Sequence, residues 1–323
     1  MKMTVRLWVP VSLALLVLGM GRSSAVERAD SLGVLFWNVE NFFDWHDGGA
    51  SASDAEFSSR GERHWTARRF FAKCNAIAKT VLYLSDREGG LPDLIALAEV
   101  ENRFVLRKLL SETLLRKADY GIVHYESQDP RGIDVALLFR TGVLDTLCCF
   151  PVAVPGVTTR DMLVAQFRTR RGDSLAVIVC HHPSKFGGTA ADPRREAAVE
   201  RLAALADSLG TAGWTRQVAL GDFNDTPDVP LYACLNQHYV NLAAPLAERG
   251  EGSIRFLGRW ELIDQCFVTP SLVAGAEFRV CHIPFLTAHD SVYAGEKPLR
   301  TYSGPRYLGG VSDHCPVFLR VVF

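Results

Sequence analysis

The sequence lacks the short motifs of zinc-binding and redox proteins, and it has no large excess of charge of either sign. None of its eight cysteines forms a Cys-x-x-Cys pair and no His-Glu-x-x-His segment is present, which argues against the common thiolate and metalloprotease zinc sites. The formal net charge is −1 at pH 7, whereas a protein held to nucleic acid mainly by bulk charge is basic. Any binding of a polyanion must therefore be local and assisted by a metal ion.

Only one apolar run approaches the length of a membrane span, and it lies at the N-terminus. It covers Leu7–Met20, about 14 residues against the ~20 that a span requires, and it follows the basic residues Lys2 and Arg6. Small residues at 23–25 come next, where a signal peptidase would cut. We expect residues 1–25 to be a secretory signal, with an uncleaved anchor as the alternative. The exported protein would be periplasmic or extracellular, without stable membrane insertion.

Eight cysteines are few for an exported chain of 323 residues, although export permits disulfide bonds. Most of them lie inside apolar runs, where a free cysteine behaves as a small hydrophobic residue. The sequence leaves open whether any of them is paired.

Helical periodicity recurs in three segments, and short apolar runs suited to buried strands separate them, which indicates a layered α/β protein. No linker, repeat or low-complexity tract divides the chain, so we expect one domain at 26–323. Two sheets of about four to six strands, packed face to face with helices outside, fit these runs. The expected helices are 66–82, 102–116 and 192–209; the expected strands are 32–37, 94–98, 120–125, 134–140, 145–153, 162–168, 174–180, 217–220, 262–269, 278–283 and 315–323, with long loops at 44–65 and 284–311.

The stretch Val218–Asp228 gives the first functional signal, because a short apolar run ends directly in a polar cluster. Asp222, Asn224 and Asp225 follow the run within a few residues. Carboxylates are rarely placed at the rim of a sheet without a metal ion, a cation or a catalytic task. The alternative is an Asx-rich turn that only ends the strand, and this stretch alone does not decide between the two.

Polar side chains border other expected strands in the same way, and ligands commonly collect at one end of a sheet. Each residue alone has an ordinary explanation, such as a cap, a turn or a satisfied core histidine. Their recurrence favours one common site. The residues are Asn38, Glu40, Glu99, His181, Asp222, Asn224, Asp264, Asp313 and His314.

This set is rich in carboxylate and amide oxygens, which suit a hard cation such as Mg²⁺, with Mn²⁺ or Ca²⁺ as alternatives. Hydrolysis of a phosphate ester can use such a set of carboxylates and two histidines together with one hard metal ion. The ion polarises a phosphoryl oxygen, a carboxylate takes the proton of water, and a cationic histidine stabilises or protonates the phosphoryl group.

Six segments in this order resemble those of the endonuclease/exonuclease/phosphatase superfamily, which includes metal-dependent phosphoesterases related to DNase I, exonuclease III-type repair nucleases and neutral sphingomyelinases. The ordered set spans nearly all of 26–323 and is far more specific than any one segment. The resemblance implies a four-layered α/β sandwich of two packed mixed sheets flanked by helices. The segments are FWNVEN at 36–41, ALAEVEN at 96–102, HHPSK at 181–185, LGDFND at 220–225, LIDQ at 262–265 and SDHCP at 312–316.

The resemblance also implies a metal site. Glu99 would be the principal ligand, helped by Asn38 and by Glu40, which stands where relatives often have aspartate. Asp313 would add to the same site.

The catalytic roles follow from the same resemblance. Asp222 would orient or deprotonate the attacking water, and Asn224 would hold the scissile phosphate. His181 would bind the phosphate or assist the leaving group. Asp264 would keep His314 oriented and cationic, as a carboxylate does for a catalytic histidine.

Three arginines in loops that resemble an exported bacterial branch of the superfamily are candidates to grip the phosphate: Arg131, Arg300 and Arg306. The alternative is that they are ordinary solvated arginines. His182 stands where many bacterial relatives have tryptophan, and it would either contact the substrate or pack in the core.

The leading interpretation is an exported, Mg²⁺-dependent phosphodiester hydrolase, a nuclease whose partner is nucleic acid. A phospholipid-directed (sphingomyelinase-like) or inositol-phosphate phosphoesterase is the alternative, and it would favour an exposed apolar loop near Phe42, Phe43 and Trp45. A catalytically inactive binding protein on the same fold is the third hypothesis, and the intact acidic and histidine set counts against it.

Overall fold

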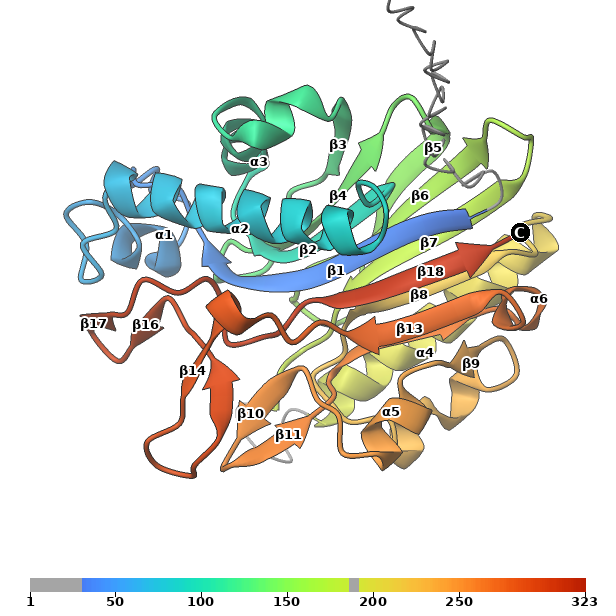
Figure 1. The fold of residues 1–323 in the computed structure, drawn as a ribbon. Helices are drawn as coiled ribbons and strands as arrows, with labels where there is room; N and C mark the ends of the chain where they lie inside the picture. The colour runs from blue at the N-terminus through green and yellow to red at the C-terminus, as the bar shows by residue number, and fades with distance from the viewer. Residues whose placement is uncertain (1–30, 186–191) are drawn as a thin grey trace, which may run out of the picture. The chain divides into compact units, whose positions relative to one another are not determined.

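The computed structural model describes residues 31–185 and 192–323, so the expected signal at 1–25 lies outside the described residues. Two six-stranded mixed sheets form the framework of this part of the chain (Figure 1). In the first sheet β1 and β2 are parallel and the other neighbours are antiparallel. Its strands, in spatial order, are β13 (Ala276–Val280), β18 (Val317–Val322), β1 (Ser31–Phe42), β2 (Leu94–Val100), β4 (Asp134–Arg140) and β3 (Tyr120–His124).

The second sheet repeats this arrangement, with one parallel pair, β7 and β8, among antiparallel neighbours. Its strands, in spatial order, are β5 (Leu144–Val152), β6 (Met162–Thr169), β7 (Ser174–His181), β8 (Gln217–Asp222), β12 (Asp264–Val268) and β9 (Val240–Asn241).

Alternation of side chains along the strands builds three apolar layers. Val34 and Phe36 of β1 belong to a core that also contains Val177 of β7 and Leu220 of β8, so the two sheets pack face to face. Trp37, from the other face of β1, joins the separate core under the helices of the first sheet. The four-layered α/β sandwich expected from the sequence is therefore confirmed.

Helices cover the outer faces of both sheets. The 21-residue α2 (Ala67–Arg87) begins at the cap Thr66 and lies along β1 and β2 (Figure 1), while α3 (Arg103–Ser111) begins at the cap Asn102. The third long helix, α4 (Asp192–Thr211), packs on the outer face of the second sheet. None of the described helices is both long and apolar enough to cross a membrane.

The expected loop at 284–311 is wrong in part, because it holds η4 (Pro284–Leu286), the hairpin β14 (Thr287–His289)–β15 (Glu296–Pro298) and the hairpin β16 (Tyr302–Ser303)–β17 (Arg306–Tyr307). Strands of two or three residues are too short to produce a readable alternation. The remaining short elements are α1 (Ala52–Glu56), η1 (Leu114–Lys117), η3 (Pro230–Leu235), α5 (Ala244–Glu248), β10 (Ile254–Phe256), β11 (Arg259–Glu261) and α6 (Pro270–Val273).

Strand direction brings the polar strand ends to one edge of the sandwich. The parallel strands β1 and β2 end there together, as do β7 and β8. The antiparallel strand β12 begins at the same edge, because Asp264 pairs with Asp222 at the end of β8. His181 at the end of β7 is the other register partner of Asp222. The sheet topology thus places residues that are far apart in sequence beside one another.

Candidate active site

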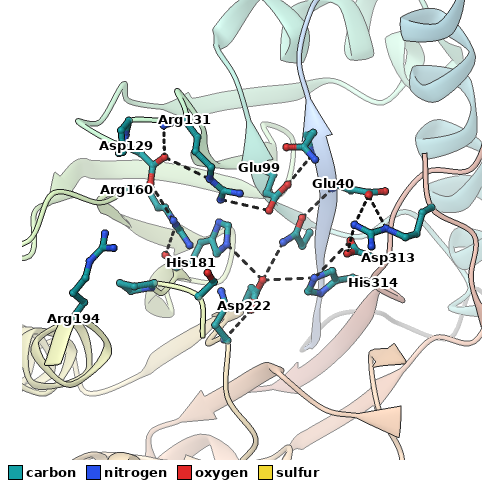
Figure 2. A pocket seen from close by; sticks show the side chains of 17 residues that line it. Glu40, Glu99, Asp129, Arg131, Arg160, His181, Arg194, Asp222, Asp313 and His314 are labelled. Carbon is teal, nitrogen blue, oxygen red and sulfur yellow. Dashed lines mark hydrogen bonds and ion pairs between the residues drawn. The ribbon is translucent and has the colours of Figure 1, made fainter. Parts of the chain in front are cut away.

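An open cavity of about 580 Å³ lies at this shared edge of the two sheets (Figure 2). Of the residues predicted from the sequence, Asp264 and Arg306 are the ones outside its lining. Asp264 lies behind His314, and Arg306 is exposed on the hairpin β16–β17. The predicted residues that line the cavity are Asn38, Glu40, Glu99, Arg131, His181, Asp222, Asn224, Arg300, Asp313 and His314.

Backbone strain marks the same edge. Glu40, Asn41, Glu99 and Asn224 all line the cavity and have φ values of 47°, 52°, 60° and 54°. Asparagine tolerates this left-handed conformation, but it is unfavourable for Glu40 and Glu99, at a cost of about 1–3 kcal/mol each. At Glu99 the strand pairing between β2 and β4 shifts register, which marks a bulge. Strain of this kind persists where the fold has to aim particular side chains.

Asp222 lies at the centre of the site, buried and contacted from several sides (Figure 2). Its Oδ2 accepts a hydrogen bond from Asn38 Nδ2 at 3.0 Å, and its Oδ1 accepts one from the backbone N–H of Asn224 at 2.9 Å. His181 Nε2 and His314 Nε2 lie 3.6 Å and 3.8 Å from Oδ2. Burial raises the pKa of Asp222 to about 7, against the opposing effect of His314.

His314 is held in place by three hydrogen bonds. Its Nδ1 lies 2.7 Å from Asp264 Oδ2, its backbone N–H donates to Ser312 Oγ at 2.9 Å, and its carbonyl accepts from Trp37 Nε1 at 2.8 Å. Burial by itself lowers the pKa of His314, but the carboxylates of Asp264 and Asp222 raise it well above its usual range. These carboxylates therefore favour the cationic form of His314.

His181 has the opposite protonation preference. Burial, followed by the positive charge of Arg160, lowers the pKa of His181 well below its usual range. The guanidinium of Arg160 is itself buried; it donates to the carbonyls of His181 and His182 at 2.8 Å and 2.6 Å and to Asp129 Oδ2 at 3.0 Å. Asp222 thus lies between a neutral and a cationic imidazole.

Glu99 offers a carboxylate to the cavity that is only partly engaged by protein groups. Its Oε2 accepts from the backbone N–H of Asn41 at 2.7 Å, and its Oε1 lies 3.7 Å from Arg131 Nη2. An oxygen ligand of this kind, supported by one backbone hydrogen bond, fits a hard divalent ion.

Glu40 and Asp313 lie on either side of Arg300. The Arg300 Nη2 is 2.9 Å from Glu40 Oε1 and 3.0 Å from Asp313 Oδ2, and the backbone N–H of Thr301 donates to Glu40 Oε2 at 2.9 Å. Burial and then the charge of Asp313 raise the pKa of Glu40, and the charges of Arg300 and Lys73 oppose this shift. Asn38, the fourth predicted ligand, uses its Oδ1 to accept from the backbone N–H of Glu40 at 3.0 Å.

Two arginines of the cavity were missed by sequence reasoning. Arg160 and Arg194 line it together with Arg131 and Arg300. Arg160 lies two residues before the expected strand 162–168, so the pattern of polar residues that border strands could have included it. Arg194, near the start of α4, carries no signal that separates it from the other charges of that helix.

His182 turns into the core beside the site. Its ring packs on Phe223 at a centroid distance of 4.6 Å, and neither ring nitrogen has a hydrogen-bond partner among the described residues. Its backbone N–H donates to the Asp222 carbonyl at 2.8 Å. Of the two roles considered for His182, the structure therefore supports packing.

Two mixed sheets that carry carboxylates and a histidine pair at one edge define a layered α/β protein of the phosphoesterase class. The chain belongs to the Endonuclease/Exonuclease/phosphatase family, whose family model matches residues 33–322. A comparison with curated protein sequences finds no significant match.

Solved structures share the fold at low sequence identity. One is TDP2 of D. rerio complexed with single strand DNA product, with a TM-score of 0.55, 14% identity, and coverage of 91% of this chain and 99% of that one. The human Nocturnin catalytic domain matches with a TM-score of 0.56, 15% identity and coverage of 91% and 96%. A mannosyl-6-phosphatase of Bacteroides thetaiotaomicron matches with a TM-score of 0.54, 16% identity and coverage of 90% and 100%.

Proposed function

We propose that this protein is an exported phosphodiester hydrolase that depends on a divalent metal ion, Mg²⁺ in the first place, and that it acts on nucleic acid as a nuclease. The observation that carries the proposal is Asp222, which lies in the cavity between the neutral His181 and the cationic His314. This arrangement pairs a proton acceptor with a fixed positive charge.

The side chains divide the work of hydrolysis. Asp222, whose pKa is about 7, is suited to take the proton of an attacking water near neutral pH, and Asn38 and Asn224 hold its carboxylate in place. His314, oriented by Asp264, stabilises the negative charge that develops on the phosphoryl oxygens. His181 lies on the other side of Asp222, where it can donate to or accept from the phosphate or the leaving group.

The proposed metal ion would be held by Glu99 with Glu40 and Asp313, and Asn38 remains a candidate fourth ligand. When bound, such an ion neutralises charge on a phosphoryl oxygen and polarises the phosphorus centre. Three carboxylates at the cavity, one of them with a raised pKa, are the chemical reason for this assignment.

Arginines and a structural neighbour support a polyanionic substrate. Arg131, Arg194 and Arg300 line the cavity, and Arg306, exposed outside it, stays a candidate for a more distant phosphate. Because the formal net charge is only −1 at pH 7, bulk charge does not attract a polyanion, and local arginines have to supply the positive charge. TDP2 of D. rerio, with its bound single-strand DNA product, provides a precedent for a nucleic-acid strand on this fold.

A phospholipid substrate is the second candidate, and exposed apolar side chains at two hairpin tips favour it. Phe256 and Leu257 of β10–β11 and Val292 and Tyr293 of β14–β15 are 56%, 65%, 71% and 49% exposed. The aromatic residues first considered for this role do not serve it, because Phe42 and Phe43 are fully buried and Trp45 packs against Phe70.

The proposal is tested by assaying plasmid DNA, bis-p-nitrophenyl phosphate and sphingomyelin vesicles, each with Mg²⁺ and with EDTA. We expect cleavage of DNA and of the diester that EDTA abolishes. Glu99→Gln should reduce the rate by at least about 100-fold without loss of stability, because the amide oxygen can still accept from Asn41 while the ligand charge is gone.

Glu112→Gln is the matched control, since Glu112 is exposed at the end of α3 and should leave the rate unchanged. Turnover of sphingomyelin without DNA cleavage would reject the nuclease in favour of the second candidate. Absence of metal-dependent turnover of every phosphoester would reject the enzyme and favour a binding protein.

A further inference from the structure

A group of side chains that could hold a metal ion lies outside the lining of the catalytic cavity, where β3 ends and β4 begins. It contains His124, Glu126 and Asp134, and one potential ligand atom from each lies within 4.8 Å of the others. His124 Nε2 is 3.5 Å from Asp134 Oδ2, and His124 Nδ1 is 3.9 Å from Glu126 Oε1. The described lining of the catalytic cavity includes none of the three.

Two of the three side chains in this cluster are buried, unlike those of an ordinary surface ion pair. The side chains of His124 and Asp134 are only 2% and 5% exposed, whereas that of Glu126 is 69% exposed, so the cluster opens to solvent on one side. His124 Nε2 is buried and makes no hydrogen bond to any described residue. A buried ring nitrogen that faces a carboxylate without bonding to it is an unsatisfied group, which normally requires a partner.

Asp134 is partly satisfied, and its free oxygen points toward the histidine. Its Oδ1 accepts from the backbone N–H of Ser127 at 3.0 Å, while Oδ2 is the atom that faces His124. The carboxylates of Asp134 and Glu126 thus both face the imidazole of His124. A cation bound among the three side chains would neutralise the two negative charges.

We propose that His124, Glu126 and Asp134 form a second binding site, separate from the catalytic one, for a divalent transition-metal ion such as Zn²⁺ or Mn²⁺. One imidazole nitrogen and two carboxylate oxygens are ligands that both ions accept, and the nitrogen disfavours Mg²⁺ and Ca²⁺. The open side at Glu126 leaves room for water to complete the coordination.

The position of the site indicates what the ion would do. His124 and Asp134 bracket the segment 125–133, which contains Asp129 and Arg131. Those two residues contact Arg160 and Glu99 at the wall of the catalytic cavity. An ion that ties both ends of this segment together would order that wall, because an ion bound only by the folded state stabilises the elements that supply its ligands.

The experiment measures metal content and local order on the full-length protein. After dialysis against Zn²⁺ or Mn²⁺ and removal of free ion, the wild type should retain about one ion per chain more than Glu126→Gln or His124→Gln. Glu126 is exposed, so its variant should fold even if the replacement of the buried His124 disturbs the structure. Glu248→Gln, an exposed replacement on α5, is the matched control and should bind as the wild type does.

Hydrogen exchange provides the second readout. Amides of 125–133 should exchange more slowly with Zn²⁺ or Mn²⁺ present in the wild type and in Glu248→Gln, but not in Glu126→Gln. Equal metal content and equal protection in the wild type and Glu126→Gln would overturn the proposal and leave His124 and Asp134 as an ion pair. Ions bound at the catalytic cavity are present in all variants and cancel in the comparison.

Discussion

His181 and His314 are both buried beside Asp222, yet their pKa values shift in opposite directions. Burial and then the charge of Arg160, whose guanidinium donates to the His181 carbonyl, lower the pKa of His181. Against the effect of burial, Asp264 raises the pKa of His314 through its 2.7 Å contact with His314 Nδ1. Residue type alone predicts the same pKa for both histidines. The difference between them therefore arises from neighbours that are distant in sequence.

His182, which has no proposed catalytic role, tests whether the surroundings of a buried histidine set its pKa. Burial lowers its pKa to about 3, whereas an unfolded histidine titrates near ~6.5. As the pH falls below ~6.5, His182 binds a proton in the unfolded chain but not in the folded chain. The free energy of unfolding therefore decreases as the pH is lowered from neutral. We expect the wild type to lose about 2 kcal/mol more than His182→Phe between pH 7.5 and pH 5.

Urea unfolding of both proteins at the two pH values measures this difference. The phenylalanine keeps an aromatic ring against Phe223, and the backbone hydrogen bond to Asp222 does not depend on the side chain. His289→Asn replaces an exposed histidine and should follow the wild type. Identical pH dependence in the wild type and His182→Phe would show that His182 gains a proton as easily in the folded state as in the unfolded one.

At the scale of elements, the parallel pair β7–β8 determines how the site is built. His181 and Asp222 are register partners at the end of this pair, and Cys180 and Gly221 are the partners just before them. A Cβ atom placed on Gly221 would lie 2.0 Å from the Cys180 carbonyl oxygen, closer than any real contact. Glycine is therefore required for the two strands to approach where the catalytic residues emerge.

Gly221→Ala should destabilise the protein by about 1–3 kcal/mol or more, because the clash is with backbone, which cannot rotate away. It should also lower the catalytic rate, since the strand ends that carry His181 and Asp222 must separate. Urea unfolding and the diester assay measure the two effects. Gly142→Ala is the matched control, as its Cβ would meet nothing within 4 Å. A Gly221→Ala protein as stable and active as the control would contradict this account of the strand pair.

The elements themselves were predictable to differing degrees. The helix expected at 66–82 is α2 at Ala67–Arg87, because a capping threonine and a long apolar stripe are both local signals. The hairpins β14–β15 and β16–β17 were missed, since their strands are held by turns and by neighbouring segments. Arg300 lies between these hairpins and reaches both Glu40 and Asp313, so the missed region supplies part of the cavity wall.

At the scale of the whole molecule, the sandwich holds together without covalent cross-links. All eight cysteines lie in the described part of the chain, and each is a free thiol. Five are buried: Cys74, Cys180, Cys266, Cys281 and Cys315. Burial raises the pKa of these thiols, which keeps them protonated and unreactive at neutral pH.

Complete denaturation in guanidinium without a reductant should therefore expose eight titratable thiols per chain, and dithiothreitol should leave the melting temperature of the native protein unchanged. A thiol-specific chromogenic reagent and a thermal melt measure the two quantities. Fewer than eight thiols in freshly purified monomer would show that a disulfide forms. Mass spectrometry would then distinguish a pair of buried cysteines from oxidation of the exposed Cys148 and Cys234.

The sequence by itself predicted the class of fold and ten of the residues that line the cavity, because both predictions rest on local patterns of apolar and polar residues. Apolar runs ending in Asn38, Glu99, His181 and Asp222 identify strand ends, and strand ends gather at an edge of a sheet. The tertiary structure decided how these residues act. The charge of each histidine, the burial of Arg160 and the cluster at His124 depend on distances between residues far apart in the chain. Electrostatic energies depend on the distances between charges and on how deeply the charges are buried. Neither quantity can be read from the sequence.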